Sequence, residues 1–573
     1  MKKKKSPVLS VLMAAAVVGI LGLIWFAADH YRPTKERMDP NTYFGIESEN
    51  AAALITDNGV SELSGMKIGE KLYLPASVVG RDICPAIFFD EAEDKLIVTT
   101  PEALETYDAS RKDIVHRDGG EVYIALEFVQ KYAEAEWSVW GNPDRVLVRT
   151  DFSYMAVNAA YDAPIRYRAG IKSPVISDVC TGQMLQNLEL GIDGSRLLKK
   201  IDGWTYVRTS NGYSGYIEDR FLDGENYPVE ETHEQVSKPY EHRLIEGGVN
   251  LIFHQTGNEA SNKALGKSIS GMTGMNVIAP TWIFLDDADG SMSSIASADY
   301  VKTAHEAGLF VWAVANDFDG EVNSSDITAE MLSSGSARTA AIERITDELL
   351  RVGADGICLD FEKITSSSAV CYLEFIRELS VETQKNGLVL SICNFVPTYT
   401  AYYNRKEQAR VADYIICMCY DEHTSGSETA GSVASLPFVR QGIRDTLKEV
   451  PAEQVIAAIP FFTRLWTTSD TGGLKSRAMS MNEASAFVLE NAMNKVWDEE
   501  TGQWYASGKG IEGTFEIWLE DMDSLNEKLR VVSEEKIAGA AAWKLGLQSE
   551  SVWTLFEGKN FYQKISVSGN APG

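Results

Sequence analysis

The sequence predicts a multidomain protein whose C-terminal half is an α/β barrel of the TIM, or (β/α)8, type. From residue 248 onward, short apolar segments alternate with amphipathic helical segments, and eight such apolar segments can be counted. Two of these segments end in carboxyl side chains. One ends in Asp360 and Glu362, and the other ends in Tyr420 followed by Asp421. Inward side chains at the strand ends emerge at the C-terminal mouth of such a barrel, where active sites lie. The alternation therefore predicts the fold, and the acids predict the functional end.

The eight predicted strands are brief and apolar, as expected for parallel strands buried on both faces. Helical stretches such as 337–352 and 436–449 lie between them. The barrel domain is expected over 245–560, with a small α+β insertion over 467–535 that contains a hairpin turning at Glu-Thr-Gly. The strands are expected at 249–254, 277–284, 310–315, 356–361, 389–394, 414–420, 455–460 and 538–543.

Composition limits the partners that this protein can have. A chain of 573 residues is too long for one hydrophobic core, and a hydrophobic content of 45% excludes global disorder. The formal net charge of −29 argues against nucleic acid, which proteins bind through Lys and Arg. The seven cysteines lack the spacing of a metal site or a disulfide framework. We therefore expect no cofactor and no metal ion.

Residues 1–30 are predicted to be a transmembrane anchor. Four lysines, Lys2 to Lys5, precede an uncharged run over 7–28. A helix over that run is about 33 Å long, enough to cross a bilayer. We expect a single-pass cell-membrane protein of a Gram-positive-type surface, with its bulk outside. The alternative is a signal peptide cleaved near Ala27-Ala28, which would release a secreted protein.

A weak repeat organises residues 40–150. The segments 71–100 and 121–150 align without gaps, and each is predicted to form a strand, a short helix and two further strands. This α+β domain resembles the N-terminal domain of copper amine oxidases. Because the segment has no His cluster, the resemblance does not imply copper. It implies a spacer or a module that binds the cell wall.

Residues 155–224 are predicted to form a small all-β barrel. Their short strands and turns include Trp204, Tyr206, Tyr213 and Tyr216, and they resemble a bacterial Src-homology-3 type domain, which implies contact with the cell wall. In so small a barrel each aromatic residue is more often core than binding surface. The polar, proline-containing segment 225–243 is predicted to be a linker.

The stretch 353–362 reads Gly-Ala-Asp-Gly-Ile-Cys-Leu-Asp-Phe-Glu. On a strand, Cys358, Asp360 and Glu362 project from one face and apolar side chains from the other. The stretch resembles the Asp-Gly-x-Asp-x-Asp-x-Glu signature of glycoside hydrolase family 18. Asp355 opens the match, and Cys358 stands where the family usually has Asp.

Two other strand ends carry the same resemblance. Met418-Cys419-Tyr420-Asp421 matches the family's Met-x-Tyr-Asp, and Trp543 stands where the family has a tryptophan beneath the central sugar. The resemblance covers 248 to about 556, which is the whole predicted barrel.

The resemblance implies a retaining, substrate-assisted glycosidase, in which the substrate's own 2-acetamido carbonyl attacks the anomeric carbon. Glu362 would be the general acid and then the general base. Asp360 would hold the acetamido nitrogen, and its negative charge would raise the pKa of Glu362. Tyr420 would donate to the acetamido oxygen. The predicted substrate-binding residues are Asp421, Trp543, Asp355, Met418, Trp282 and Asn394.

The implied substrate is a polysaccharide containing N-acetylglucosamine: peptidoglycan, chitin or an N-glycan core. The wall-type modules and the predicted membrane anchor favour peptidoglycan. Two readings of another class stay open. A family 18 barrel with weak or no catalysis could act as a lectin-like envelope protein, or the barrel could serve only as a scaffold.

Cys358 is the departure from the family pattern. An Asp at this position would share a proton with Asp360, whereas a buried thiol stays protonated. We therefore expect Cys358 to donate a weak hydrogen bond to Asp360, and Asp360 to be permanently ionised.

Overall fold

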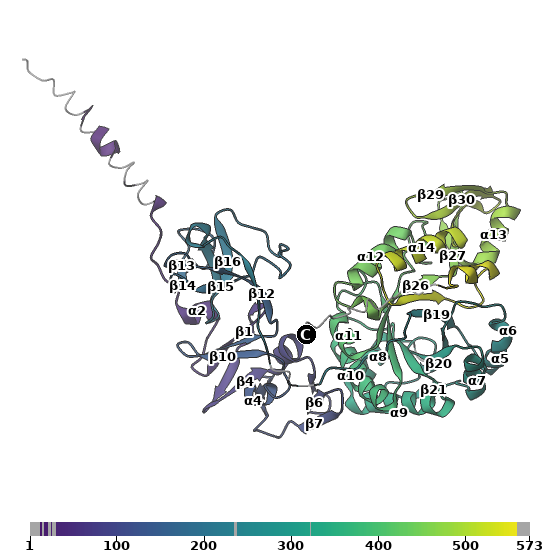
Figure 1. Cartoon of the computed structure of the whole chain (residues 1–573), viewed down its shortest axis with the longest axis horizontal. Helices are drawn as coiled ribbons and strands as arrows, with labels where there is room; N and C mark the ends of the chain where they lie inside the picture. The colour runs from purple at the N-terminus through teal and green to yellow at the C-terminus, as the bar shows by residue number, and fades with distance from the viewer. Residues whose placement is uncertain are drawn as a thin grey trace, which may run out of the picture. The chain divides into compact units, whose positions relative to one another are not determined.

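The computed structural model describes residues 12–13, 16–20, 25, 30–233, 236, 238–320 and 323–558. The chain divides into two compact units (Figure 1). Unit 1 comprises Met1–Phe89 and Tyr107–Ser237, and unit 2 comprises Asp90–Thr106 and Lys238–Gly573.

The predicted repeat of strand, helix and hairpin is present in both copies. Strand β4 leads into α3 and strand β9 into α4, and β4 pairs antiparallel with β9. The hairpins that follow are β5–β6 and β10–β11, and β11 pairs parallel with β1. The main sheet has the order β10-β11-β1-β3-β4-β9-β8, with β2 beside β1. The bounds are α2 Pro40–Phe44, β1 Ala51–Thr56, β2 Gly59–Val60, β3 Gly65–Ile68, β4 Lys71–Pro75, α3 Ala76–Val78, β5 Ile87–Asp90, β6 Lys95–Thr99, β7 Leu104–Asp108, β8 Val115–Asp118, β9 Glu121–Ala125, α4 Leu126–Val129, β10 Glu136–Trp140 and β11 Arg145–Arg149.

A second sheet in unit 1 has seven strands in the order β14-β13-β17-β16-β15-β12-β18. Of the aromatic residues named in this segment, Tyr213 is buried, whereas Tyr206 and Tyr216 lie half-buried with ring centroids 4.8 Å apart. The segment predicted as a linker differs from expectation, because residues 227–230 form β18 and pair with β12. The bounds are β12 Ser153–Asn158, β13 Ala163–Arg166, β14 Val175–Val179, β15 Met184–Asn187, β16 Trp204–Arg208, β17 Ser214–Glu218 and β18 Tyr227–Glu230.

Unit 2 is built on the predicted eight-stranded parallel barrel. The strands follow the order β19-β32-β26-β25-β24-β23-β22-β20, and the pairing of β19 with β20 closes the barrel. Helices lie around the outside of these strands (Figure 1). Every predicted strand is present, with ends shifted by two residues or fewer. The strands are β19 Val249–His254, β20 Val277–Leu285, β22 Phe310–Asn316, β23 Gly356–Asp360, β24 Val389–Phe395, β25 Tyr414–Met418, β26 Val455–Pro460 and β32 Gly539–Trp543.

The barrel helices have clear local start and stop signals. Ser334 caps α9 by accepting a hydrogen bond from the backbone of Ala337, and Gly353 ends this helix in the left-handed conformation at φ 74°. The chain then turns directly into β23, which carries Asp360. The helices are α5 Glu259–Lys263, α6 Leu265–Ser268, α7 Ala298–Glu306, α8 Ser325–Ser333, α9 Gly335–Val352, α10 Ala369–Asn386, α11 Arg405–Val411, α12 Leu436–Thr446 and α14 Met522–Glu534; β21, Met292–Ser294, forms a hairpin with β20.

The insertion after β26 is a five-stranded antiparallel sheet with its own small core. It begins at Phe462, earlier than predicted, and the predicted hairpin is β29–β30, with Gly502 at φ 64° in its turn. Helix α14 was predicted inside the insertion but packs on the barrel strands β26 and β32. The elements are β27 Phe462–Thr468, β28 Leu474–Ser480, α13 Met481–Glu490, β29 Asn494–Asp498, β30 Gln503–Gly510 and β31 Gly513–Leu519.

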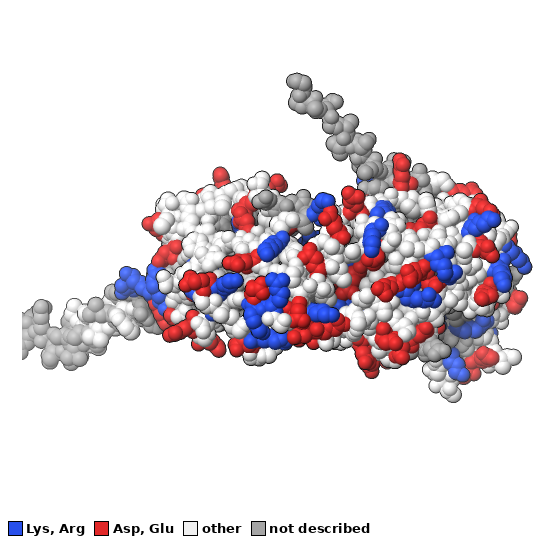
Figure 2. All heavy atoms as spheres, turned by 90° about the horizontal axis from the view of Figure 1, so that it is seen from below, with Lys and Arg blue, Asp and Glu red and all other residues white. Residues whose placement is uncertain are grey.

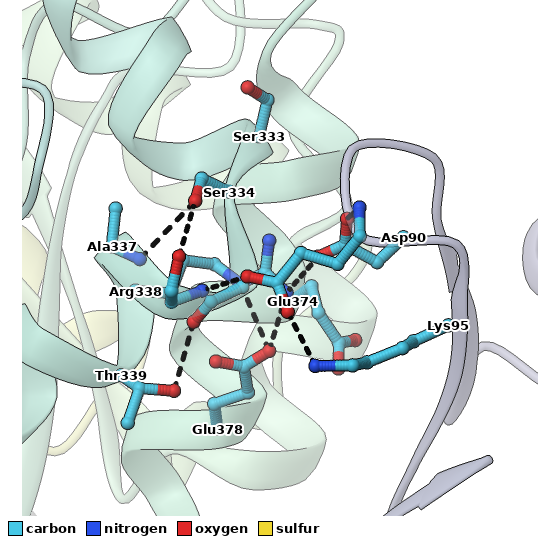
Figure 3. A network of polar contacts seen from close by, with 12 residues as sticks. Asp90, Lys95, Ser333, Ser334, Ala337, Arg338, Thr339, Glu374 and Glu378 are labelled. Carbon is cyan, nitrogen blue, oxygen red and sulfur yellow. Dashed lines mark hydrogen bonds and ion pairs between the residues drawn. The ribbon is translucent and has the colours of Figure 1, made fainter. Parts of the chain in front are cut away.

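Residues 90–106 belong to the barrel unit, although the sequence placed them in the α+β domain. Asp90 forms an ion pair of 3.0 Å with Arg338 on α9, and Arg338 also pairs with Glu378 on α10 at 2.8 Å (Figure 3). Thr99 donates to Glu374, also on α10, at 3.1 Å. The Arg338 side chain has 0% exposure, so this network is buried between residues 90–106 and the outer helices α9 and α10.

The predicted membrane location is contradicted by the described structure. Among the residues that the structure describes, no helix is both long and apolar enough to cross a membrane. Much of the segment 7–28 lies outside the described residues.

The acidic excess is spread over the surface. On the face shown in Figure 2, Lys and Arg side chains lie among more numerous Asp and Glu side chains. The negative charge on this face therefore does not form one separate patch.

Candidate active site

Acidic side chains from neighbouring strands meet at the carboxyl end of the barrel. Asp360 is the last residue of β23, Glu362 follows it by two positions, and Tyr420 and Asp421 follow β25. Burial raises the pKa of Tyr420, and the nearby charges of Asp360, Glu362 and Asp421 add to this rise, so the four side chains lie together. The structure thus assembles the predicted catalytic residues with one predicted substrate-binding acid.

Asp360 is a buried carboxyl group, 4% exposed, with one oxygen available. The pKa of Asp360 is raised to about 7. Burial is the main cause and the nearby Asp317 adds to the rise, whereas a hydrogen bond from the Cys393 thiol opposes it. Its Oδ1 atom has no hydrogen-bond partner among the described residues. A buried acceptor without a partner costs free energy, so this oxygen is suited to a donor on a ligand.

Glu362 can hold a proton at neutral pH. Its pKa is raised to about 8, mainly by burial and also by the charges of Asp360, Asp317 and Asp421, whereas Lys363 opposes the shift. A carboxylic acid that is protonated near neutrality is the group that general acid catalysis needs.

Asp317 supports this pair and was not predicted from the sequence. It follows β22, and its carboxylate accepts hydrogen bonds from the backbone N–H groups of Glu362 at 2.8 Å and Lys363 at 3.1 Å. Thr328 also donates to it at 3.0 Å. Asp317 therefore holds the backbone at Glu362 and Lys363 in place. The available signal was an acid directly after an apolar strand, as at Asp421.

Asp421, Trp543 and Met418 lie at or beneath the same end of the barrel. Asp421 has a positive φ of 61°, and burial raises its pKa while Arg464 opposes the rise. Trp543 ends β32 half-buried, with its ring centroid 5.4 Å from that of Phe253. Met418 ends β25 and is buried two residues before Tyr420.

Two predicted substrate-binding residues face away from the barrel mouth. Trp282 is 0% exposed, and its Nε1 donates to Asn262 on α5 at 2.9 Å. Asn394 is buried, and its Nδ2 donates to Gln408 on α11 at 2.6 Å. Both side chains are engaged by outer helices, although Asn394 Oδ1 has no hydrogen-bond partner among the described residues.

Asp355 lies at the opposite end of the barrel. It directly precedes β23, where its Oδ2 accepts from the backbone of Val311 at 2.7 Å and lies 2.8 Å from Nε2 of His305. It links the beginnings of β22 and β23. The prediction that Asp355 binds substrate is therefore wrong, because the strand's amino end is remote from the mouth.

The thiol beside Asp360 belongs to Cys393 on β24. The Cys393 thiol donates to Asp360, and the Cys358 Sγ instead lies 3.3 Å from the Cys393 Sγ. The expectation that Cys358 would donate to Asp360 is not met, because among the hydrogen bonds of the described residues Cys358 contacts only the sulfur of Cys393. The expectation of a permanently ionised Asp360 is wrong as well, because burial raises its pKa.

Within the described part of the chain, no group of three or more His, Cys, Asp or Glu side chains is arranged to hold a metal ion.

Comparison with known proteins relates the barrel to one family of glycosidases. Residues 320–548 match the model of glycosyl hydrolases family 18. The matched range contains Asp360, Glu362, Tyr420 and Asp421 and begins after Asp317. The match supports glycosidase activity for the barrel.

Relatives of this domain are distant in sequence. The chain is 26% identical over 318 residues to the uncharacterized glycosylase YvbX of Bacillus subtilis, covering 53% of this chain and 89% of that protein. It is 24% identical over 251 residues to the cortical fragment-lytic enzyme of Bacillus subtilis, covering 42% of this chain and only 58% of that protein. The crystal structure of the Bacillus cereus spore cortex-lytic enzyme SleL shares the fold, with a TM-score of 0.50 and 17% identity, over 59% of this chain and 78% of that one.

Proposed function

We propose that the barrel hydrolyses β-linked glycans at N-acetylglucosamine by a retaining, substrate-assisted mechanism. One observation carries the proposal: Glu362, with a pKa of about 8, lies beside Asp360, whose buried Oδ1 has no partner among the described residues. The pair combines a proton donor with an acceptor for an amide N–H.

In the first step, Glu362 donates its proton to the glycosidic oxygen while the acetamido carbonyl oxygen attacks the anomeric carbon. The glycosidic bond breaks, and a positively charged oxazolinium ring forms. Asp360 Oδ1 accepts from the acetamido N–H, and the Asp360 carboxylate offsets the ring's charge. The Tyr420 hydroxyl group donates a hydrogen bond to the acetamido oxygen. Glu362 then takes a proton from the water that opens the ring, which restores both groups.

The remaining residues of the mouth bind the sugar. Asp421 is placed to line the acetamido pocket beside Tyr420. Trp543 offers a half-buried ring on which the apolar face of a sugar stacks. Met418 supports Tyr420 from below.

The substrate class proposed first is peptidoglycan, with chitin-type glycans as the alternative. The names of the cortical fragment-lytic and spore cortex-lytic relatives support it. The chain spans only part of the length of several relatives. The N-terminal unit lies outside the family match at residues 320–548, so its role is proposed separately. We assign it to wall binding, on its resemblance to copper amine oxidase N-terminal and Src-homology-3 type domains.

A substrate pair tests the mechanism on the full-length protein. Oligosaccharides of N-acetylglucosamine should be cleaved with release of reducing ends, and NMR should show the β-anomer as the first product. The same oligosaccharides with free amino groups in place of the acetamido groups should not be cleaved, because the internal nucleophile is missing. Cleavage of both would contradict substrate assistance. Binding without any cleavage would instead establish a lectin-like barrel.

A further inference from the structure

Lys544 occupies an unusual position at the barrel mouth. It follows Trp543 directly at the end of β32, and its ammonium group lies 5.9 Å from the centroid of the Trp543 ring. It donates a hydrogen bond to the side-chain oxygen of Gln255, which follows β19. Lys544 is thus a half-buried cation beside the ring proposed to carry a sugar.

The charge of Lys544 is not matched by a direct ion pair. Among the residues that the structure describes, no carboxylate lies within ion-pair distance of its Nζ, and only the more distant Asp319 favours its charge. The His254 ring on β19 also faces it and is neutral, because burial and Lys544 lower the pKa of that ring to about 4. Burial lowers the pKa of Lys544 itself.

Lys528 in the same unit is a structural ammonium group whose charge is paired. That side chain is fully buried and lies 3.0 and 2.9 Å from the two carboxylate oxygens of Glu520. Lys544 has only a neutral amide oxygen as its direct partner. An ammonium group has three donors, so two remain after the bond to Gln255.

We propose that Lys544 binds a carboxylate carried by the glycan, and that it makes the mouth selective for acidic N-acetylamino sugar polymers over neutral ones. This inference rests on the proposed function. Chitin-type polymers are neutral, whereas peptidoglycan from which the stem peptides have been removed carries a free lactyl carboxylate close to the ring of each N-acetylmuramic acid. Partial burial strengthens a charge-assisted hydrogen bond. The protein as a whole has a negative net charge and repels anions. A cation at this position therefore contributes more to the distinction between acidic and neutral glycans than it would on a basic protein.

Two variants and three substrates test this inference in the full-length protein. The substrates are a tetramer of N-acetylglucosamine, a tetramer alternating N-acetylglucosamine with N-acetylmuramic acid, and the latter with its carboxylates converted to amides. Lys544→Met should lower kcat/KM for the acidic tetramer by roughly tenfold, mainly through KM, and should leave the neutral tetramer unchanged. Lys544→Arg should retain most of the activity on the acidic tetramer. Amidation should cause the same loss with the unmodified protein and no further loss with Lys544→Met.

Lys385→Met, which removes a charge exposed on α10, is the matched control and should change neither substrate. Equal losses on the acidic and neutral tetramers with Lys544→Met would overturn the inference, because Lys544 would then only support Trp543. If no substrate is cleaved, the proposed hydrolysis fails, but calorimetric binding of the same tetramers still decides the carboxylate preference. A roughly tenfold weaker binding of the acidic tetramer alone to Lys544→Met would support it, and unchanged binding would overturn it.

Discussion

The barrel buries two groups of carboxyl side chains that differ in what neutralises them. On its outer face, Glu378 forms an ion pair of 2.8 Å with Arg338 (Figure 3), and Glu374 accepts a hydrogen bond from Thr99. At its mouth, within the described part of the chain, no guanidinium or ammonium group forms a hydrogen bond with Asp360 or Glu362.

The comparison shows that a raised pKa alone does not identify a catalytic acid. Burial raises the pKa of both Glu362 and Glu374 to about 8. Glu374, however, lies among helices with its partners already present, whereas Glu362 lies at a strand end beside an unpartnered acceptor. Position and unsatisfied hydrogen bonding therefore separate the reacting group from the structural one.

The strongest test of this comparison is to neutralise the two glutamates in turn. Glu362→Gln keeps the shape and removes the transferable proton, so kcat on N-acetylglucosamine oligosaccharides should fall by about 10²–10⁴-fold. Glu374→Gln makes the same chemical change in a more deeply buried group and should leave kcat unchanged. Loss of activity in both variants, or in neither, would remove the distinction between the two groups.

Removing the cation from the outer group should affect stability and not the rate. Arg338→Met leaves Asp90 and Glu378 buried without a counter-charge, which should lower the free energy of unfolding by about 3–5 kcal/mol. Arg344→Met breaks an ion pair on the same helix that is partly exposed, and should cost about 0–1 kcal/mol. Urea unfolding measures both variants. A loss below 1 kcal/mol for Arg338→Met would mean that residues 90–106 do not depend on this ion pair.

The two groups should also differ in their dependence on pH. A carboxyl group whose pKa is raised by folding stabilises the fold fully below its ordinary pKa, and that contribution is lost as pH rises towards the raised value. Glu374→Gln should therefore match the unmodified protein in stability at pH 4 and exceed it at pH 8. Activity should instead fall as pH rises through about 8, where Glu362 loses its proton. Equal stability of the two proteins at both pH values would contradict the raised pKa of Glu374.

The barrel and its central acids were predictable because they depend on local patterns. Alternation along β23 and β25 placed Asp360, Glu362 and Tyr420 on the inward face, and continuous apolar runs marked the strands. Strand alternation did not predict the orientation of Trp282. Strand β20 shifts its register between Thr281 and Ile283, and this shift changes which side chains point inward.

Other features depend on contacts between distant segments. Asp317 serves the site through two backbone N–H groups, and its position directly after an apolar strand does not reveal this role. Residues 90–106 leave the sheet pattern of their own repeat and join the barrel through Arg338. Neither assignment can be made from strand and helix periodicity.

The smallest expected effect concerns the two cysteines beneath the mouth. The Cys393 thiol donates to Asp360 and lowers its pKa, whereas Cys358 contacts only the sulfur of Cys393 among the hydrogen bonds of the described residues. Cys393→Ala should therefore raise the pKa of Asp360 and move the acidic limb of the pH–rate profile to higher pH, by less than about one unit.

Cys358→Ala is the matched control, because it removes the same atoms from the neighbouring strand without removing the donor to Asp360. It should leave the acidic limb where it is, and Cys393→Ser should restore that limb in full or in part, since a hydroxyl group can donate in place of the thiol. Profiles of kcat against pH for the three variants decide the matter. If Cys358→Ala shifts the limb and Cys393→Ala does not, the donor to Asp360 is Cys358, and the pattern first expected from the sequence is correct after all.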